Sequence, residues 1–579
     1  MTEIKQSQAE LASIEALEAM YDCLRSGVCF RLEAGAGAGK TYSLVHALLW
    51  IIKNRKSNLG KNQQRVACIT YTNAAKDEIE RRIDSNPLVE VATIHSFCWN
   101  LISGFQKALK DKINELDAWV ERLEDAGGIQ ERQIDYNLGH RYVNDKTISL
   151  HHDDVIPLTV AFMENAKFNG LISAQFPIIL IDEYQDTNKD WIAAILKHFI
   201  DLKVGPMFGF FGDHWQKIYG NGCGELSHPS IKQIGKKANF RSVKTIVDGL
   251  NNMRPDLPQF PEDENSVGEI RVFHTNNWKG ERRTGQGGGH WTGDLPEETA
   301  KSAYRETIKN LEDSGWDFTE DKTKILMLTH RLLASEQGYP NIVKAFRYRD
   351  DYIIPDHPYI QFFYNDLEPA RDAFLNRKYG VMMNAFSSKL PLLKGSGDKA
   401  KWTSMMSEFI AMGDEVSVGV LIDFFKKKGI PQLPEKIIRI ENELSSEKMD
   451  ADPLERKLQE ATNFRDVQYS EVRSLVSFLK GHSPFATKHG VKGLEFENVL
   501  VVIGRGWNQY NFGQMLDWIS TGIPKGKEET FIRNRNLFYV TCSRAKKRLA
   551  LLFTQELTDD AISVLEEWYD KKSVVPIDF

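Results

Sequence analysis

Cysteine is scarce in this sequence and has no regular spacing. The chain has 579 residues but only six cysteines, none of them in a C-x-x-C pair. Scattered cysteines exclude a zinc ribbon and a disulfide framework, and they fit a reducing compartment. No stretch approaches the roughly 18 consecutive apolar residues of a membrane span, and the first residues lack a basic region followed by an apolar run. We therefore expect a cytoplasmic protein without a membrane anchor.

An excess of positive charge is missing as well. The formal net charge is −6, so the protein does not coat nucleic acid through overall charge, and any nucleic-acid site must be local. Hydrophobic residues make up 41% and charged residues 27%, as in ordinary globular proteins. Because a single core stops growing at roughly 250 to 300 residues, we expect several domains.

Apolar runs and helical patterns alternate in two blocks, which predicts an α/β fold with parallel sheets. Two intervals, 99–167 and 331–481, are polar and largely helical and are interpreted as insertions. The glycine-rich segment 275–294 is predicted to be a mobile loop, because it has little apolar surface to bury. The predicted strands are 28–33, 65–70, 178–181 and 207–212 in the first block, and 324–329, 499–503 and 549–553 in the second.

The strongest local signal is AGAGAGKT at 34–41, directly after a predicted strand and before a helical pattern. Small residues such as Gly35, Gly37 and Gly39 let backbone N–H groups turn toward phosphate oxygens. Lys40 would supply a cation to the β and γ oxygens, and Thr41 would hold Mg²⁺. A glycine-rich helix cap, the structural alternative, does not need Lys-Thr after the last glycine. The segment therefore predicts a phosphate loop.

A second segment, which is acidic, completes this prediction. The apolar run at 178–181 ends in Asp182 and Glu183. Asp182 would bind Mg²⁺, while Glu183 would accept a proton from the attacking water. Alone the pair is weak evidence, because many buried strands end in acidic residues. Together with the phosphate loop it indicates ATP hydrolysis with Mg²⁺.

Seven further segments resemble the motifs of the UvrD/Rep family of superfamily 1A DNA helicases. Together with the phosphate loop they give eight matches, in the family's order, between residues 34 and 547. The seven segments are TYTNAA (70–75), TIHSF (93–97), DEYQDTN (182–188), GDHWQKIY (212–219), NFRS (239–242), TKHGVKGLEF (487–496) and LFYVTCSRAK (537–546).

The resemblance implies two RecA-like P-loop NTPase domains, each interrupted by a largely helical accessory insertion. The two insertions match the family only in position. We expect the first RecA-like domain at 1–98 and 168–238, interrupted by an insertion at 99–167. We expect the second at 239–332 and 482–579, interrupted by an insertion at 333–481.

The resemblance also implies roles at the nucleotide site. Gln216 would sense the γ-phosphate, and Arg241 and Arg544 would be arginine fingers from the second RecA-like domain. Planar guanidinium groups suit this role, because they stabilise charge on the transferring phosphoryl group. Phe240 replaces the family's usual tyrosine, and a phenyl ring still stacks on adenine. Glu495 would hold the ribose.

Contacts to DNA must be local and tolerant of sequence, which stacking of bases on aromatic rings provides. Tyr71 and Tyr219 match the family's stacking positions. Asn73, His95 and His489 match its polar contacts to the strand. We therefore expect single-stranded DNA, or a duplex with a 3′ tail, as the partner.

A histidine-rich segment offers an alternative site. His151, His152, Asp153 and Asp154 are consecutive, and metal coordination is one interpretation. Four adjacent residues cannot all face one ion, so we favour a helix-capping loop.

Two departures from the family pattern affect the functional prediction. The glutamine that reads adenine upstream of the phosphate loop has no counterpart at the right spacing, which leaves the preference for ATP open. At Asn221 the family commonly has a tryptophan, and the missing ring would weaken base stacking.

We weigh three function classes. The first is an ATP-dependent 3′–5′ translocase or helicase on single-stranded DNA. The second is a regulatory ATPase that senses DNA or nucleotides and controls a separate nuclease, since compact proteins of this type resemble helicase subunits of anti-phage systems such as Gabija. Only about 30 residues follow Lys547, which leaves no room for a fused nuclease. A P-loop kinase or transporter ATPase fails, because it has no use for the later motifs.

Overall fold

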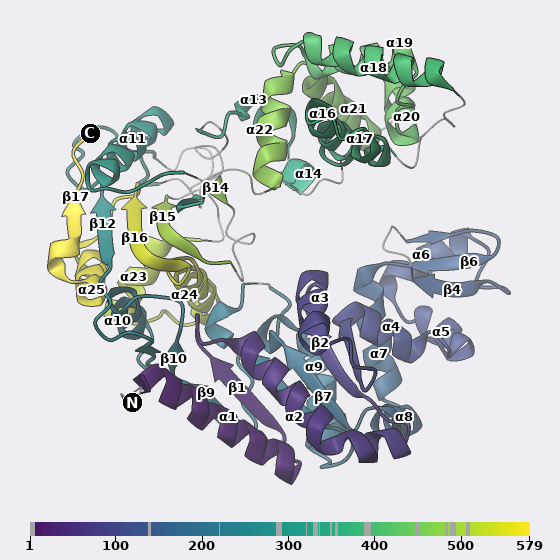
Figure 1. Ribbon diagram of the computed structural model, residues 1–579, viewed down its shortest axis with the longest axis vertical. Helices are drawn as coiled ribbons and strands as arrows, with labels where there is room; N and C mark the ends of the chain where they lie inside the picture. Colours follow the sequence, from purple (N-terminus) through teal and green to yellow (C-terminus); the bar gives the residue numbers. More distant parts are fainter. Residues whose placement is uncertain are drawn as a thin grey trace.

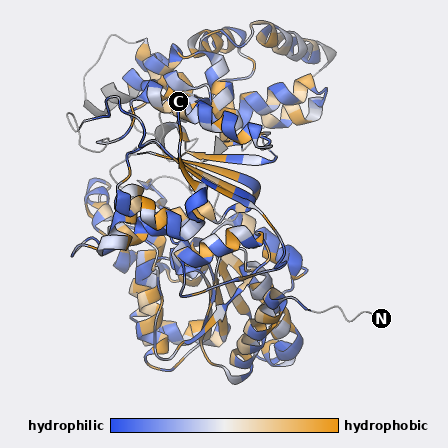
Figure 2. Ribbon diagram, turned by 90° about the vertical axis from the view of Figure 1, so that its left-hand side faces the viewer, coloured by the Kyte–Doolittle hydropathy of each residue, from blue (hydrophilic) through white to orange (hydrophobic). Residues whose placement is uncertain are grey.

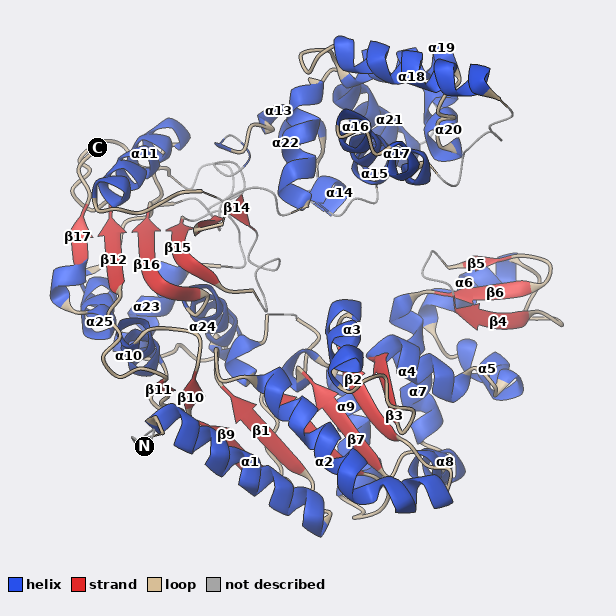
Figure 3. Ribbon diagram, viewed as in Figure 1, coloured by secondary structure: helices blue, strands red, loops and turns tan. Residues whose placement is uncertain are grey.

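Two parallel sheets of six strands form the framework of the protein (Figures 1 and 3). The first has the order β3-β2-β7-β8-β1-β9. Its strands are β1 (Phe30–Ala34), β2 (Val66–Thr70), β3 (Val89–Thr93), β7 (Ile178–Asp182), β8 (Met207–Gly212) and β9 (Lys232–Lys236). The computed structural model describes residues 6–136, 141–218, 220–284, 292–319, 321–327, 334, 336–347, 350–353, 357–386, 395–445, 452–480, 485–486, 494–504 and 510–579.

Helices cover both faces of the first sheet. Every residue of β1, β2, β7 and β8 is buried, which explains why β2, β7 and β8 are mainly apolar, whereas β1 also buries the charged residues Arg31 and Glu33. Leu180 and Phe211 pack on one face with α1–α3, while Ile181 and Phe210 pack on the other with α4 and α7–α9. The helices are α1 (Gln8–Ser26), α2 (Lys40–Lys61), α3 (Asn73–Arg82), α4 (Ile94–Ile102), α7 (His152–Met163), α8 (Ala166–Gln175) and α9 (Lys189–Ile195).

The second sheet has the order β14-β13-β15-β16-β12-β17, again with all strands parallel. Figure 2 shows hydrophobic residues along the strands of both sheets. The strands are β12 (Glu269–His274), β13 (Thr323–Met327), β14 (Phe485–Ala486), β15 (Phe496–Ile503), β16 (Ala545–Phe553) and β17 (Val574–Pro576). The helices beside them are α10 (Lys244–Met253), α11 (Glu297–Asp313), α23 (Phe512–Thr521), α24 (Glu528–Cys542) and α25 (Asp559–Tyr569).

The first insertion differs in part from the prediction. It contains helices, but also a small sheet with the order β4-β6-β5. Its strands have four residues or fewer, too short for the sequence to show a period of two. The elements are α5 (Gln106–Ile113), α6 (Asp117–Asp125), β4 (Gln133–Tyr136), β5 (Tyr142–Val143) and β6 (Thr147–Leu150).

The second insertion is helical throughout its described part and forms a body beyond the second sheet (Figure 1). Its core is continuous with one face of that sheet, since Phe363 and Phe409 belong to the same cluster as Leu500 and Leu552. The elements are α13 (Pro340–Ala345), α14 (Asp350–Ile353), α15 (Pro358–Gln361), η4 (Phe362–Leu367), α16 (Glu368–Leu375), α17 (Tyr379–Ala385), α18 (Ser396–Ala411), α19 (Val418–Lys428), α20 (Glu435–Leu444), α21 (Asp452–Arg465) and α22 (Tyr469–Leu479).

These sheets confirm the predicted fold class of an α/β protein with parallel sheets. The domain boundaries stay a prediction. Residues 285–291 of the glycine-rich segment lie outside the described residues, and the described flank at Arg282 donates hydrogen bonds to the carbonyls of Gly293 and Thr554, both at 3.2 Å. All six cysteines are free thiols, as expected. Among the helices that the structure describes, none is long and apolar enough to cross a membrane.

Candidate nucleotide and DNA site

The predicted site residues of the first sheet lie where its strands end. The phosphate loop follows β1, Asp182 ends β7, and Gln216 follows β8 in the short helix η3 (His214–Gln216). Tyr71 follows β2, and His95 follows β3 in the first turn of α4. Because all these strands are parallel, the residues share one edge of the sheet, where open α/β sheets bind ligands. The strand order places the DNA candidates at β3 and β2 and the nucleotide candidates at β7, β8 and β1.

The phosphate loop has the backbone that its glycines permit. Gly37 and Gly39 have φ angles of 76° and 75°, and Gly39 is the N-cap of α2. A Cβ atom on Gly37 would lie 2.5 Å from Asn239 Oδ1 and 2.7 Å from Arg241 Cβ. The loop is therefore packed directly against the predicted motif of the second domain. N–H groups at the start of α2 provide an anion site.

Lys40 and Glu183 face each other across this site. Lys40 Nζ donates a hydrogen bond of 3.1 Å to Glu183 Oε2. Glu183 has a φ of 49°, an uncommon value for a residue other than glycine, and it follows the buried Asp182. The Thr41 hydroxyl and the Asp182 carboxylate are hard oxygen donors, which fit Mg²⁺ together with phosphate oxygens.

Gln216 lies between the two domains. Its Nε2 donates to Asp213 Oδ2 at 2.6 Å, and its Oε1 accepts from Arg544 Nη2 at 3.3 Å. Arg544, between α24 and β16, is 1% exposed and also donates to the carbonyl of Val540 at 2.9 Å. Burial, and then the charge of Arg241, lower the pKa of Arg544 to about 9. Two neighbouring cations at a buried position favour an anion such as phosphate.

Arg241 and Phe240 also lie beside the phosphate loop. The Phe240 N–H donates to the carbonyl of Gly37 at 2.9 Å, and the residue is 39% exposed. Arg241 Nε donates to Glu495 Oε2 at 2.9 Å, while Lys546 Nζ lies 2.6 Å from Glu495 Oε1. Although burial opposes it, hydrogen bonds from Lys546 and Arg241 lower the pKa of Glu495. A finger role requires Arg241 to exchange this carboxylate for phosphate.

The residues predicted to contact DNA differ in their exposure to solvent. Tyr71 is 39% exposed, and Asn73 is exposed at the start of α3. His95 is half-buried, and its ring centroid lies 4.4 Å from that of His152. Burial, and then His152, lower the pKa of His95 to about 4, so its ring is neutral near pH 7. Tyr219 and His489 lie outside the described residues.

The histidine-rich segment caps a helix, as predicted. His151 is the N-cap of α7, where its Nδ1 accepts a hydrogen bond of 3.3 Å from the N–H of Asp153. The Asp154 carboxylate accepts from the N–H of His151 at 2.8 Å, which completes a capping box. The helix-capping interpretation is therefore confirmed.

One cation beside the phosphate loop was not predicted from the sequence. Lys236 ends β9, is fully buried, and donates to Ser43 Oγ at 2.9 Å and to the carbonyl of Gly39 at 3.4 Å. Its Nζ also lies 5.4 Å from the centroid of the Tyr42 ring. A single lysine in a polar edge strand forms no pattern, so only the register of β9 beside β1, with Lys236 paired to Ala34, could have revealed it.

Lys236 makes a testable contribution to the pH dependence of stability. Burial lowers its pKa from 10.5 to about 8, so between these values the unfolded chain binds more protons than the folded one. The cost of the buried charge is fully present below pH 8 and disappears toward pH 10.5. We expect the melting temperature of the wild type to rise relative to Lys236→Met between about pH 7.5 and about pH 10.

The control for this comparison is Lys232→Met, because Lys232 is an exposed residue of the same strand. Its melting temperature should keep a constant difference from the wild type across this range. A constant difference for Lys236→Met as well would refute the assignment of a buried charge.

A phosphate loop after the first strand of a parallel sheet, packed against a second parallel sheet that carries arginines, defines a P-loop ATPase with two RecA-like domains. Comparison with known families is more specific. The model of the UvrD/REP helicase N-terminal domain matches residues 23–132 and 126–226, and that of the UvrD-like helicase C-terminal domain matches 374–556. These matches cover more than half of the chain. The protein belongs to the UvrD-like helicase family, as the sequence motifs indicated.

Two relatives show how far the similarity extends along the chain. The chain is 24% identical to the Gabija protein GajB of Bacillus cereus (strain HuB5-5), over 94% of this chain and 96% of that protein. It is also 24% identical to the ATP-dependent DNA helicase PcrA of Staphylococcus aureus (strain Mu50), over 38% of this chain and 37% of PcrA. The match to GajB thus spans nearly the whole of both chains, whereas that to PcrA covers little more than a third of each.

Proposed function

We propose that this helicase hydrolyses ATP between its two RecA-like domains and uses the cycle to move 3′ to 5′ along single-stranded DNA. The observation that carries the proposal is the contact between Gly37 of the phosphate loop and Asn239–Arg241 of the second domain. Nucleotide bound at this loop would touch both domains, so hydrolysis would change how they meet. The DNA candidates lie on the same edge of the first sheet, at β2 and β3.

In the proposed cycle, Lys40 leaves Glu183 and binds the β and γ phosphate oxygens. Glu183, released from its ion pair, accepts the proton of the attacking water. Mg²⁺ held by Thr41 and Asp182 would, when bound, neutralise charge on the phosphates. Gln216 orients toward the γ-phosphate, and Arg241 and Arg544 stabilise the charge that develops during transfer.

Polarity is tested by displacement of streptavidin from biotinylated single strands. A 3′–5′ motor moves toward the 5′ end, so we expect ATP to accelerate displacement from that end only. Lys40→Ala serves as the control without hydrolysis. Acceleration at the 3′ end alone would contradict the proposed direction.

Unwinding by the isolated protein is expected to be poor on long duplexes. The residue at 221 is an exposed asparagine, and its carbonyl accepts from the N–H of Lys189 at 3.1 Å. Without an aromatic ring at this position the grip on the strand loses one stacking contact, worth roughly 1 to 3 kcal/mol. We expect ATPase activity stimulated by DNA, but strand displacement that falls steeply with duplex length. Efficient unwinding of long 3′-tailed duplexes by the protein alone would contradict this loose coupling.

A second candidate function is favoured by the nearly full-length similarity to GajB. In this alternative the motor senses DNA or nucleotides and controls a separate nuclease in anti-phage defence. ATPase activity that does not respond to DNA, but changes when a co-expressed nuclease is bound, would favour the alternative over translocation.

A further inference from the structure

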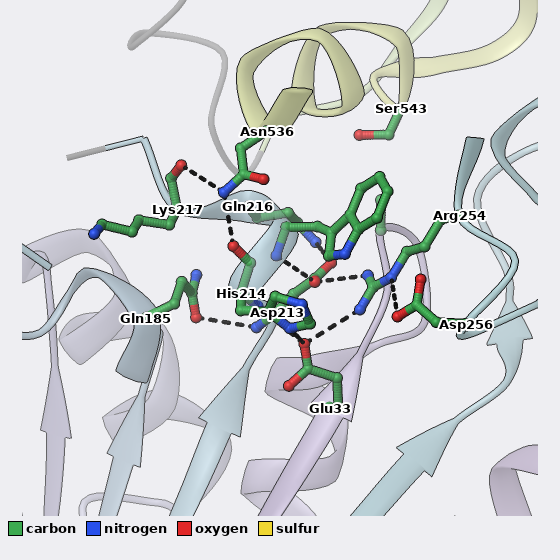
Figure 4. Close-up of polar contacts among 12 residues, drawn as sticks. Glu33, Gln185, Asp213, His214, Gln216, Lys217, Arg254, Asp256, Asn536 and Ser543 are labelled. Atoms are coloured by element: carbon green, nitrogen blue, oxygen red, sulfur yellow. Dashed lines mark hydrogen bonds and ion pairs between the residues drawn. The ribbon is translucent and has the colours of Figure 1, made fainter. Parts of the chain in front are cut away.

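A buried ionic cluster joins the two domains behind the nucleotide site (Figure 4). Arg254 follows α10 of the second domain. Its Nη1 donates to Asp213 Oδ1 at 2.7 Å, and its Nη2 donates to Glu33 Oε1 at 3.2 Å. Asp213 follows β8 and Glu33 lies in β1, so a cation of the second domain sits between two carboxylates of the first.

The cluster is almost completely shielded from water. The exposed fractions of the side chains are 2% for Arg254, 0% for Asp213 and 8% for Glu33. Burial alone would lower the pKa of Arg254, but Asp213, Tyr539 and Glu33 raise it above its usual value, so the guanidinium stays charged. A buried ion pair adds little net stability, because desolvation offsets its Coulomb energy. The cluster therefore serves to fix one arrangement of the two domains, not to add net stability.

Aromatic rings from both domains enclose the guanidinium. The Arg254 Cζ lies 5.3 Å from the ring centroid of Trp215 and 5.8 Å from that of Tyr539. These two rings meet edge to face at 5.4 Å. Asn536 Nδ2 donates to the carbonyl of His214 at 2.8 Å, which fixes the same segment by its backbone. The segment that carries Gln216 is thus held by the second domain through several contacts.

The cluster is not proposed as a metal site, although Glu33, Asp213 and His214 bring their ligand atoms within 4.8 Å of one another. Arg254 already donates to both carboxylates, and His214 Nδ1 lies 2.6 Å from Glu33 Oε1. A guanidinium occupies the place that a cation would need.

Asp213 links Arg254 to the nucleotide site. One of its oxygens accepts from Arg254, and the other accepts from Gln216 Nε2 at 2.6 Å. Gln216 in turn accepts from Arg544 Nη2 at 3.3 Å. The chain of hydrogen bonds begins and ends in the second domain and passes through the residue expected to sense the γ-phosphate.

We propose that Arg254 is a positioning residue that makes the orientation of Gln216 depend on domain closure, acting through Asp213. The inference rests on the proposed ATP hydrolysis between the domains. Separation of the domains withdraws Arg254, and Asp213 then no longer holds the Gln216 amide in one direction. A planar fork is required, because one group must donate to two carboxylates at once.

The test is Arg254→Lys, which keeps the charge but not the fork. With saturating oligo(dT), we expect kcat for ATP to fall roughly 10- to 100-fold while KM stays within about threefold of the wild type. Hydrogen exchange of the amides at 213–218 should be faster than in the wild type. The matched control is Lys244→Ala, since Lys244 lies on α10 but pairs only with the exposed Asp248 among the described residues. It should change neither kinetic constant.

Glu33→Gln is the second variant, and it tests the positioning role of Arg254 if Arg254→Lys does not fold. It removes one charge from the cluster but leaves the contact between Arg254 and Asp213. We expect a smaller fall in kcat, again with little change in KM. The inference is overturned if Arg254→Lys folds and keeps the kcat and the hydrogen exchange at 213–218 of the wild type. If only Glu33→Gln folds, an unchanged kcat in that variant overturns it. Absence of ATPase activity in the wild type would instead refute the proposed function.

Discussion

Replacement of Lys40 by alanine is expected to lower kcat for ATP hydrolysis by roughly 100- to 1,000-fold or more. Lys40 begins α2 beside the phosphate loop, and its ammonium pairs with Glu183 at 3.1 Å rather than packing in the core. The substitution removes the cation that binds the transferring phosphate. The core below the helix, formed by residues such as Leu44 and Leu48, is unchanged. Steady-state ATPase measurements on the folded variant give the result directly.

Two controls accompany this measurement. Lys53→Ala removes an exposed lysine from the same helix and should leave kcat unchanged. Binding of fluorescent oligo(dT) to Lys40→Ala should stay close to that of the wild type, because Tyr71 and Asn73 follow β2 rather than β1. Turnover near the wild-type rate in Lys40→Ala would remove the phosphate-loop assignment.

Replacement of Arg241 or Arg544 by alanine is expected to lower kcat far more than the affinity for nucleotide. Fingers act on charge that develops in the transition state, so their loss appears in kcat rather than in ground-state binding. Arg241 donates hydrogen bonds to Glu495 and to the carbonyl of Ser543. These contacts hold it beside the loop, and its side chain is not part of the hydrophobic core. We expect a fall in kcat of roughly 100-fold or more for each variant, measured beside the Kd of a non-hydrolysable ATP analogue.

Arg544 needs an additional control because it is buried. Its guanidinium donates to the carbonyl of Val540 and to Gln216, so alanine removes one donor from each of these buried acceptors. Arg544→Lys retains the charge and is measured beside Arg544→Ala, together with the melting temperature of each. Arg548→Ala changes a half-buried arginine of β16 that donates to the carbonyl of Gly315, and it should leave kcat unchanged. A large rise in KM with unchanged kcat would contradict the finger role.

The fold was predictable where strands are buried on both faces. Strands β7 and β8 are continuous apolar runs, and the structure places them within one residue of the predicted bounds. The edge strands β3, β9, β14 and β17 were missed because an edge needs less apolar sequence. β12 was also missed, although it lies inside the second sheet, because charged and apolar residues are mixed in it. The sheet of the first insertion is too short to leave a periodic signal.

The site was predictable in its motifs but not in its contacts. The loop and the acidic pair follow from residue chemistry, and the order of the remaining motifs supplied Gln216 and Arg544. Nothing local indicates that these two residues, 328 positions apart, share a hydrogen bond. Glu33 and Arg254 were missed for the same reason, since each is a single charged residue whose partner lies far away in the sequence. Such pairs appear only when the fold brings both domains together.

If DNA drives a nucleotide cycle between the two domains, ATP turnover must depend on DNA, and it is measured with and without oligo(dT). We expect oligo(dT) to raise kcat of the wild type roughly tenfold or more. Oligo(dT) should have no such effect on Lys40→Ala. A wild-type rate that is the same with and without DNA would refute a DNA-driven cycle between the domains.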